Sequence, residues 1–180
     1  MATIVEALDL LASKQWWKEW QNPAWKQFIQ TGDKSLLKKL PKFPDHTWLP
    51  IELLGALPQP DELDESAKRF LQACCSIGHP SAIGAWISKC YGNGSAATEQ
   101  FARACDLALE FGCSKLFVAS QIVKHVRPIA SEDGKFTPAG GFLLLLDDKE
   151  AAQLYREFGG TGFRAEEIAA VFVSQAPERW

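Results

Sequence analysis

Hydrophobic residues recur at helical spacing along most of this chain. Placed 100° apart, the apolar residues near the amino terminus gather on one face and predict a first helix over about residues 3–20. A second, short helix is expected to begin near Pro23, because proline is tolerated at the first helical position. Asp33 or Ser35 is then placed to cap a third helix through Leu40. The face of the first helix consists of Val5, Leu8, Ala12, Trp16 and Trp20.

The central third of the chain has the most regular pattern. Asp61 is an expected N-cap for the first of four helices, and Gly78 and Gly112 stand where helix-ending glycines are common. Ser95 is placed to cap the third of these helices, and Pro128 is placed to close the fourth. Short turns between them predict antiparallel helical hairpins.

Two stretches interrupt this pattern. Residues 41–60 hold five of the ten prolines and predict a connector with a helix at about 48–57. Residues 129–147 are expected to form a long loop with an apolar end packed inside. A helix capped by Asp147 or Asp148 and a last helix at about 164–174 follow.

These elements predict an all-α fold of about eight to ten short helices, without a substantial sheet. A length of 180 residues suits a single domain, 1–180. The prolines indicate a subdivision into an N-terminal subdomain 1–40, the connector 41–60 and a helical bundle 61–180.

Charge and hydropathy narrow the classes of partner. A net charge of −3 disfavours nucleic-acid binding, which requires a dense basic surface. The longest apolar run, residues 142–146, is far shorter than the ~20 residues that span a bilayer. The amino terminus carries Glu6 and Asp9 and lacks the basic start of a signal peptide. We therefore expect a cytoplasmic protein without membrane insertion.

The cysteines and histidines do not form a known reactive pattern. Zinc sites usually combine two closely spaced ligand pairs, and the five cysteines contain none. We expect no metal, no cofactor and no required disulfide, with the cysteines acting as small core residues. Cys113 follows a helix-ending glycine and is the strongest candidate for a reactive thiol. His46, His79 and His125 are expected at the surface or in caps.

Tryptophan is the most unusual component, because four of the seven lie within residues 16–25. Trp17 points away from the apolar face of the first helix, and Trp25 lies on a short helix that cannot be buried on every side. Trp is enriched at protein interfaces, where it buries a large area at a small entropic cost. Trp17 and Trp25 are the predicted partner-binding residues, and core packing is the alternative.

The sequence therefore favours a non-enzymatic protein-interaction domain, with another protein as its partner and its oligomeric state open. Small acidic immunity proteins, adaptors and chaperones share this profile. The alternative is an enzyme or small-ligand-binding protein that uses a pocket between helices, because sites are assembled from residues distant in sequence. A contiguous apolar surface patch around Trp17 and Trp25 favours the first function, and a closed polar cleft with perturbed titratable groups favours the second.

Overall fold

The computed structural model describes residues 2–14, 18–43, 49–77, 79, 81–91, 95–125, 138–158 and 168. Within these ranges the backbone forms helices and turns and no strand, so the predicted all-α class is confirmed. The helices of the described residues are α1 (Ile4–Ala12), α2 (Pro23–Thr31), η1 (Lys34–Lys39), α3 (Ile51–Ala56), η2 (Pro60–Glu62), α4 (Glu65–Ser76), α5 (Ser81–Cys90), α6 (Ser95–Glu110), α7 (Lys115–His125), α8 (Pro138–Leu143) and α9 (Asp148–Phe158); η marks a 3-10 helix.

Side-chain caps set the start of several helices. Thr3 and Glu6 form a reciprocal capping box at α1, and Asp147 and Glu150 form the same arrangement at α9. Helix α2 begins at Pro23, as the sequence predicts, and Asn22 caps it. Asp33 caps η1, Asp64 caps α4, and the expected N-cap Asp61 instead lies inside η2. The carboxylate of Asp64 takes the cap position because it accepts a hydrogen bond from the Ala67 amide at 2.7 Å.

The first helix is shorter than predicted. It ends at Ala12, and residues 18–21 form a turn instead of a continuation. The side-chain amide of Gln21 donates to the backbone carbonyls of Leu11 and Lys14, which replaces the intrahelical bonds that these carbonyls would otherwise accept. Trp20 therefore enters the core from a turn.

The predicted loop at 129–147 is wrong for its second half. Residues 138–143 form α8, with turns over Leu144, Leu145 and Leu146 that bond back to the helix. Leu is a strong helix former, and that propensity prevails here over the neighbouring glycines. Residues 129–137 and the predicted helix at 164–174, apart from the buried Ile168, lie outside the described residues.

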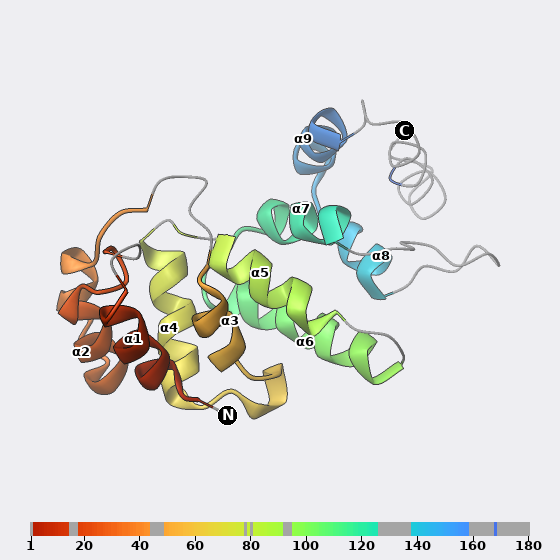
Figure 1. Cartoon of the computed structure of the whole chain (residues 1–180). Helices are drawn as coiled ribbons and strands as arrows, with labels where there is room; N and C mark the ends of the chain where they lie inside the picture. Colours follow the sequence, from red (N-terminus) through yellow and green to blue (C-terminus); the bar gives the residue numbers. More distant parts are fainter. Residues whose placement is uncertain are drawn as a thin grey trace.

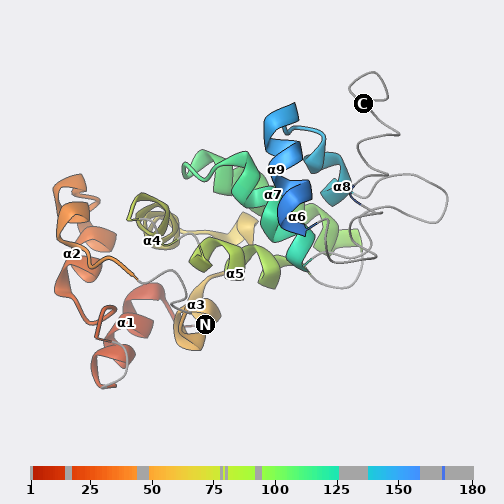
Figure 2. The same cartoon turned by 90° about the horizontal axis from the view of Figure 1, so that it is seen from above.

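The helices are arranged roughly in sequence order along the molecule (Figures 1 and 2). Helices α1 and α2 form one end with η1, where α2 packs on η1 and α4, and α1 packs on α3. Helix α5 packs most extensively on α6 and also contacts α4 and α7. At the other end α7 contacts both α8 and α9, and α6 contacts α8. Helix α3, from the predicted connector, touches both α1 and α5, and the proposed subdivision into 1–40, 41–60 and 61–180 remains a prediction.

Close packing between α5 and α7 depends on one glycine. A Cβ placed on Gly84 would lie 2.2 Å from Oε1 of Gln121, so the absence of a side chain at residue 84 makes room for this buried amide. The two ends of the molecule are thus joined through a tightly packed centre.

Candidate functional site

The predicted interface residue Trp25 belongs to the core. Its side chain is 0% exposed, so its expected position on the surface is wrong. Helix α2 is covered by η1 on one side and by α4 on another, and these layers bury a face that a lone nine-residue helix would leave in water. Trp17 lies outside the described residues.

Trp25 is part of an aromatic cluster formed by Trp20, Trp25, Phe43, Phe70 and His79. The ring centres of Trp20 and Trp25 are 5.0 Å apart, and those of Trp20 and Phe43 are 4.5 Å apart. The rings of Phe43 and His79 stack at 4.4 Å. Tilted and offset rings at these separations are favourable beyond the area that they bury. The cluster joins α2 and α4 to the turns on either side of them.

His79 is buried in this cluster at 2% exposure, which corrects its expected place at the surface. The Ser81 hydroxyl lies 3.0 Å from Nδ1, whereas Nε2 is buried without a hydrogen-bond partner. Burial lowers the pKa of His79 from 6.5 to about 4, because the charged imidazolium would lose its hydration. His79 is therefore a neutral core residue at physiological pH.

Three cysteines are core residues, as predicted. Cys74, Cys90 and Cys105 are buried, and burial raises the pKa of each thiol, to about 12 for Cys90 and Cys105. Cys75 and Cys113 are only partly buried, and the interaction between their thiols raises the pKa of Cys75 and lowers that of Cys113. Within the described residues, no group of three Cys, His, Asp or Glu side chains is placed to hold a metal ion.

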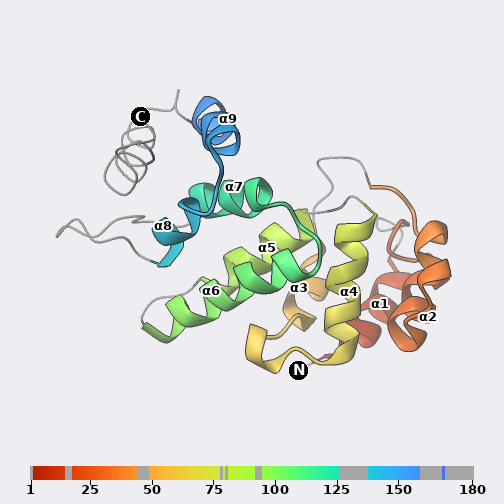
Figure 3. The ribbon, with the colours of Figure 1, turned by 180° about the vertical axis from the view of Figure 1, so that it is seen from behind.

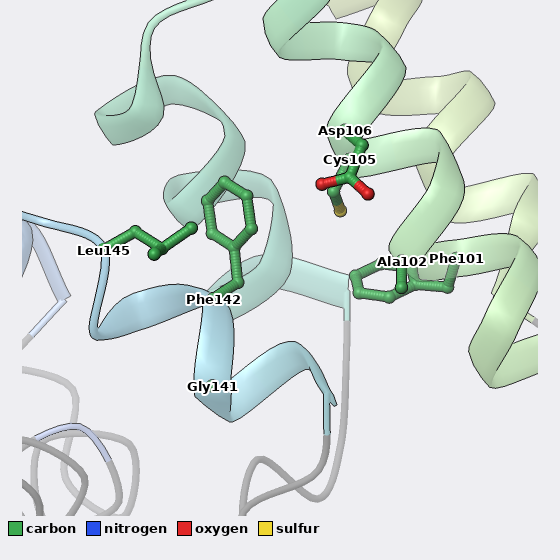
Figure 4. A pocket seen from close by; sticks show the side chains of 7 residues that line it. All are labelled: Phe101, Ala102, Cys105, Asp106, Gly141, Phe142 and Leu145. Atoms are coloured by element: carbon green, nitrogen blue, oxygen red, sulfur yellow. The ribbon is translucent and has the colours of Figure 1, made fainter.

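A cavity of about 210 Å³ lies between α6 and α8 (Figure 4). We call it the α6/α8 groove. Its lining is mostly apolar, and Phe142 and Leu145 face α6 across the opening in Figure 4. Leu145 remains 53% exposed beside it. The lining residues are Phe101, Ala102, Cys105, Asp106, Gly141, Phe142 and Leu145.

The groove can bind apolar groups but has little acid–base capacity. Asp106 is exposed and supplies the one carboxylate among the lining residues. The Cys105 thiol stays protonated near neutral pH, because burial raises its pKa to about 12. This hollow is not the apolar patch around Trp17 and Trp25 that the sequence suggested, because residues of α6 and of the α8 region line it.

Sequence reasoning missed this site because it treated residues 142–146 as a buried loop end. Phe142, Leu143 and Leu146 are indeed buried, but Leu145 is half exposed at the groove. A five-residue apolar run does not reveal which member is exposed, because its pattern has no period. The sequence does contain the aromatic residues Phe101 and Phe142 of the site. They indicate a groove only when the fold places them close together, because they lie far apart in the sequence.

Comparisons with protein families, with curated proteins and with solved structures gave no match to this chain. Among the described helices, none is both long enough and apolar enough to cross a bilayer.

Proposed function

We propose that this protein is a non-enzymatic protein-interaction domain that acts in the cytoplasm as an adaptor, chaperone or immunity protein. Its binding site is the α6/α8 groove, and its partner is a polypeptide segment that inserts one apolar side chain. The observation that carries this proposal is the open apolar hollow next to the half-exposed Leu145.

The chemistry of the rim defines the partner further. Binding covers Leu145 and places the partner next to the exposed Asp106 carboxylate. A Lys or Arg beside the inserted residue would pair with this carboxylate, and such complementarity improves specificity and association rate. The expected ligand is therefore a segment that carries a large apolar residue and a neighbouring basic residue.

The size of the groove supports a side chain rather than a complete small molecule. Pockets for drug-sized ligands usually measure about 300–1,000 Å³. The volume here is about 210 Å³. A small apolar ligand in the same hollow is the second candidate, and the same lining residues would contact it.

Selection from a displayed library of random 12-residue peptides would test the proposal. We expect the selected peptides to share an apolar residue flanked by Lys or Arg. Changing Leu145→Ala should weaken their binding by about 30-fold, the loss typical of a central interface residue. Asp106→Asn should weaken binding less and should reduce its dependence on salt.

Leu10 provides the matched control. It is the same residue type, is 51% exposed against 53% for Leu145, and lies on α1 at the other end of the molecule. Leu10→Ala should leave peptide binding unchanged. Equal losses of peptide affinity for Leu10→Ala and Leu145→Ala would contradict a site in the groove. So would selected peptides whose binding is changed by neither Leu145→Ala nor Asp106→Asn.

A further inference from the structure

Exposed lysines gather on η1 and on the three residues that follow it. Residues 34–42 contain no aspartate or glutamate. Elsewhere in the same part of the chain Lys14 pairs with Glu52 and Lys26 pairs with Asp9, whereas no described carboxylate lies within ion-pair distance of the lysines at η1. We call this group the η1 lysines, and its members are Lys34, Lys38, Lys39 and Lys42.

The backbone that carries the η1 lysines is anchored to the rest of the protein. Leu36 and Leu40 are buried beneath it, and η1 packs on α2. The side-chain amide of Asn22 donates to the carbonyl of Lys39 at 3.1 Å, which ties the end of η1 to the start of α2. The ammonium groups therefore project from a fixed segment.

Helix stability does not explain this group. Lys38 and Lys39 lie in the last turn of η1, where a positive charge favours the helix dipole. Lys34 occupies the first position, where the dipole disfavours a positive charge, and Lys42 lies beyond the helix. The carboxylate of Asp33 is occupied in capping, because it accepts a hydrogen bond from the amide of Ser35 at 2.9 Å.

Charge is divided unevenly along the chain. Residues 1–43 carry seven lysines and four carboxylates, a net charge of +3, whereas the remainder carries twelve basic and eighteen acidic residues, a net charge of −6. The described helices follow one another along the molecule, so η1 lies beside α2 at one end and α9 lies at the other (Figures 1 and 3). The η1 lysines thus form a positive end on a chain that is acidic elsewhere.

We propose that the η1 lysines dock this protein end-on, without insertion, onto an anionic phospholipid bilayer. A planar surface meets one end of the molecule and leaves the acidic remainder beyond the Debye length of about 8 Å at physiological salt. A long polyanion such as a nucleic acid would also extend along the acidic part, which would repel it. Residues 1–68 contain no arginine, so this end lacks the planar forks that bind individual phosphates or carboxylates in pairs. Lysine point charges suit the diffuse charge of a membrane surface.

The test is co-sedimentation of the full-length chain with vesicles that contain equal amounts of phosphatidylserine and phosphatidylcholine. We expect binding to these vesicles at low salt, release in about 1 M salt, where the Debye length is about 3 Å, and no binding to vesicles of phosphatidylcholine alone. Each lysine near an anionic surface strengthens binding by about fivefold. Replacing all four η1 lysines with Gln should therefore weaken binding on the order of several hundred-fold.

A second quadruple variant provides the matched control. It removes four positive charges from exposed positions on α7 and α9, at the opposite end of the molecule, and should leave vesicle binding nearly unchanged. Leu145→Ala should also leave it unchanged, because the bilayer does not use the α6/α8 groove. The four control changes are Lys115→Gln, Lys124→Gln, Lys149→Gln and Arg156→Gln.

The unaltered chain decides the proposal even if a variant does not fold. Its lysines are acetylated with an amine-reactive ester, with and without vesicles, and the modified peptides are mapped by mass. The vesicles should protect the η1 lysines and leave Lys115 and Lys149 as reactive as before. The proposal is overturned by equal protection of all these lysines, by equal binding to vesicles of phosphatidylcholine, or by equal losses in the two quadruple variants. Absence of binding to the phosphatidylserine vesicles, or tighter binding to single-stranded RNA or polyglutamate, would overturn it as well.

Discussion

Aromatic residues are buried at both ends of this molecule, but only one end leaves a groove beside them. At one end the aromatic cluster of Trp20, Trp25, Phe43, Phe70 and His79 is closed, and each of its rings is buried. At the other end Phe101 and Phe142 are also buried, but they line a groove that stays open beside the half-exposed Leu145. The tryptophans that the structure describes, Trp20, Trp25 and Trp86, are thus core residues, and a region without a described tryptophan forms the apolar hollow.

The difference arises from the number of layers that cover each region. Helix α2 is flanked by η1 and α4, and Trp20 packs against Phe43 and Phe70 from a turn. The six-residue α8 contacts α6 and α7, and part of its length faces the groove. A helix of six residues covers little of α6, so the groove stays open beside it.

Removal of a cluster ring should have the largest effect. Trp25→Ala should cost about 3–5 kcal/mol of unfolding free energy, because it opens a cavity in a closed core. Leu145→Ala should cost less than about 1 kcal/mol, because half of that side chain is already in water. Urea denaturation followed by circular dichroism measures both. A small loss for Trp25→Ala would mean that the aromatic cluster is not closed.

Acid should destabilise the same cluster through His79. The folded-state pKa is about 4, below the usual value of 6.5, so the unfolded chain binds this proton first as pH falls. The stabilisation is complete above pH 6.5 and is lost between pH 6.5 and about 4. The difference of about 2.5 pKa units corresponds to about 3 kcal/mol.

The measurement is the unfolding free energy of the unaltered chain and of His79→Phe across this pH range. The variant keeps a ring to stack on Phe43 but cannot be protonated, so its stability should depend less on pH. His46→Gln and His125→Gln serve as controls for the other two histidines. If the unfolding free energy of His79→Phe depends on pH as strongly as that of the unaltered chain, His79 is not the titrating group.

The smallest effects come from two glycines in matched six-residue helices. A Cβ added at Gly55 in α3 or at Gly141 in α8 would meet no atom within 4 Å. Each Gly→Ala change should therefore raise the unfolding free energy by about 0.5–1 kcal/mol, because alanine loses less backbone entropy in a helix. Thermal denaturation measures both variants.

Binding separates these two glycines. Gly141 lines the groove, so Gly141→Ala should also change the affinity of the selected peptides, whereas Gly55→Ala should not. If Gly141→Ala and Gly55→Ala stabilise the chain equally and bind the peptides with equal affinity, the groove near Gly141 does not contact the ligand.

Local chemistry by itself determined the helical class and many helix boundaries. Asn22 before Pro23, Asp33 before η1, Gly112 after α6 and Asp147 before α9 were identifiable from the sequence, because caps depend on residues only a few positions apart. The exceptions also have local causes, since Asp64 competed with Asp61 for a cap.

Tertiary structure decided which side chains are covered. The apolar face of a helix can be read from its period, but the element that packs on it is set by contacts between residues far apart in the chain. That is why Trp25 and His79 are buried, whereas Leu145 is half exposed.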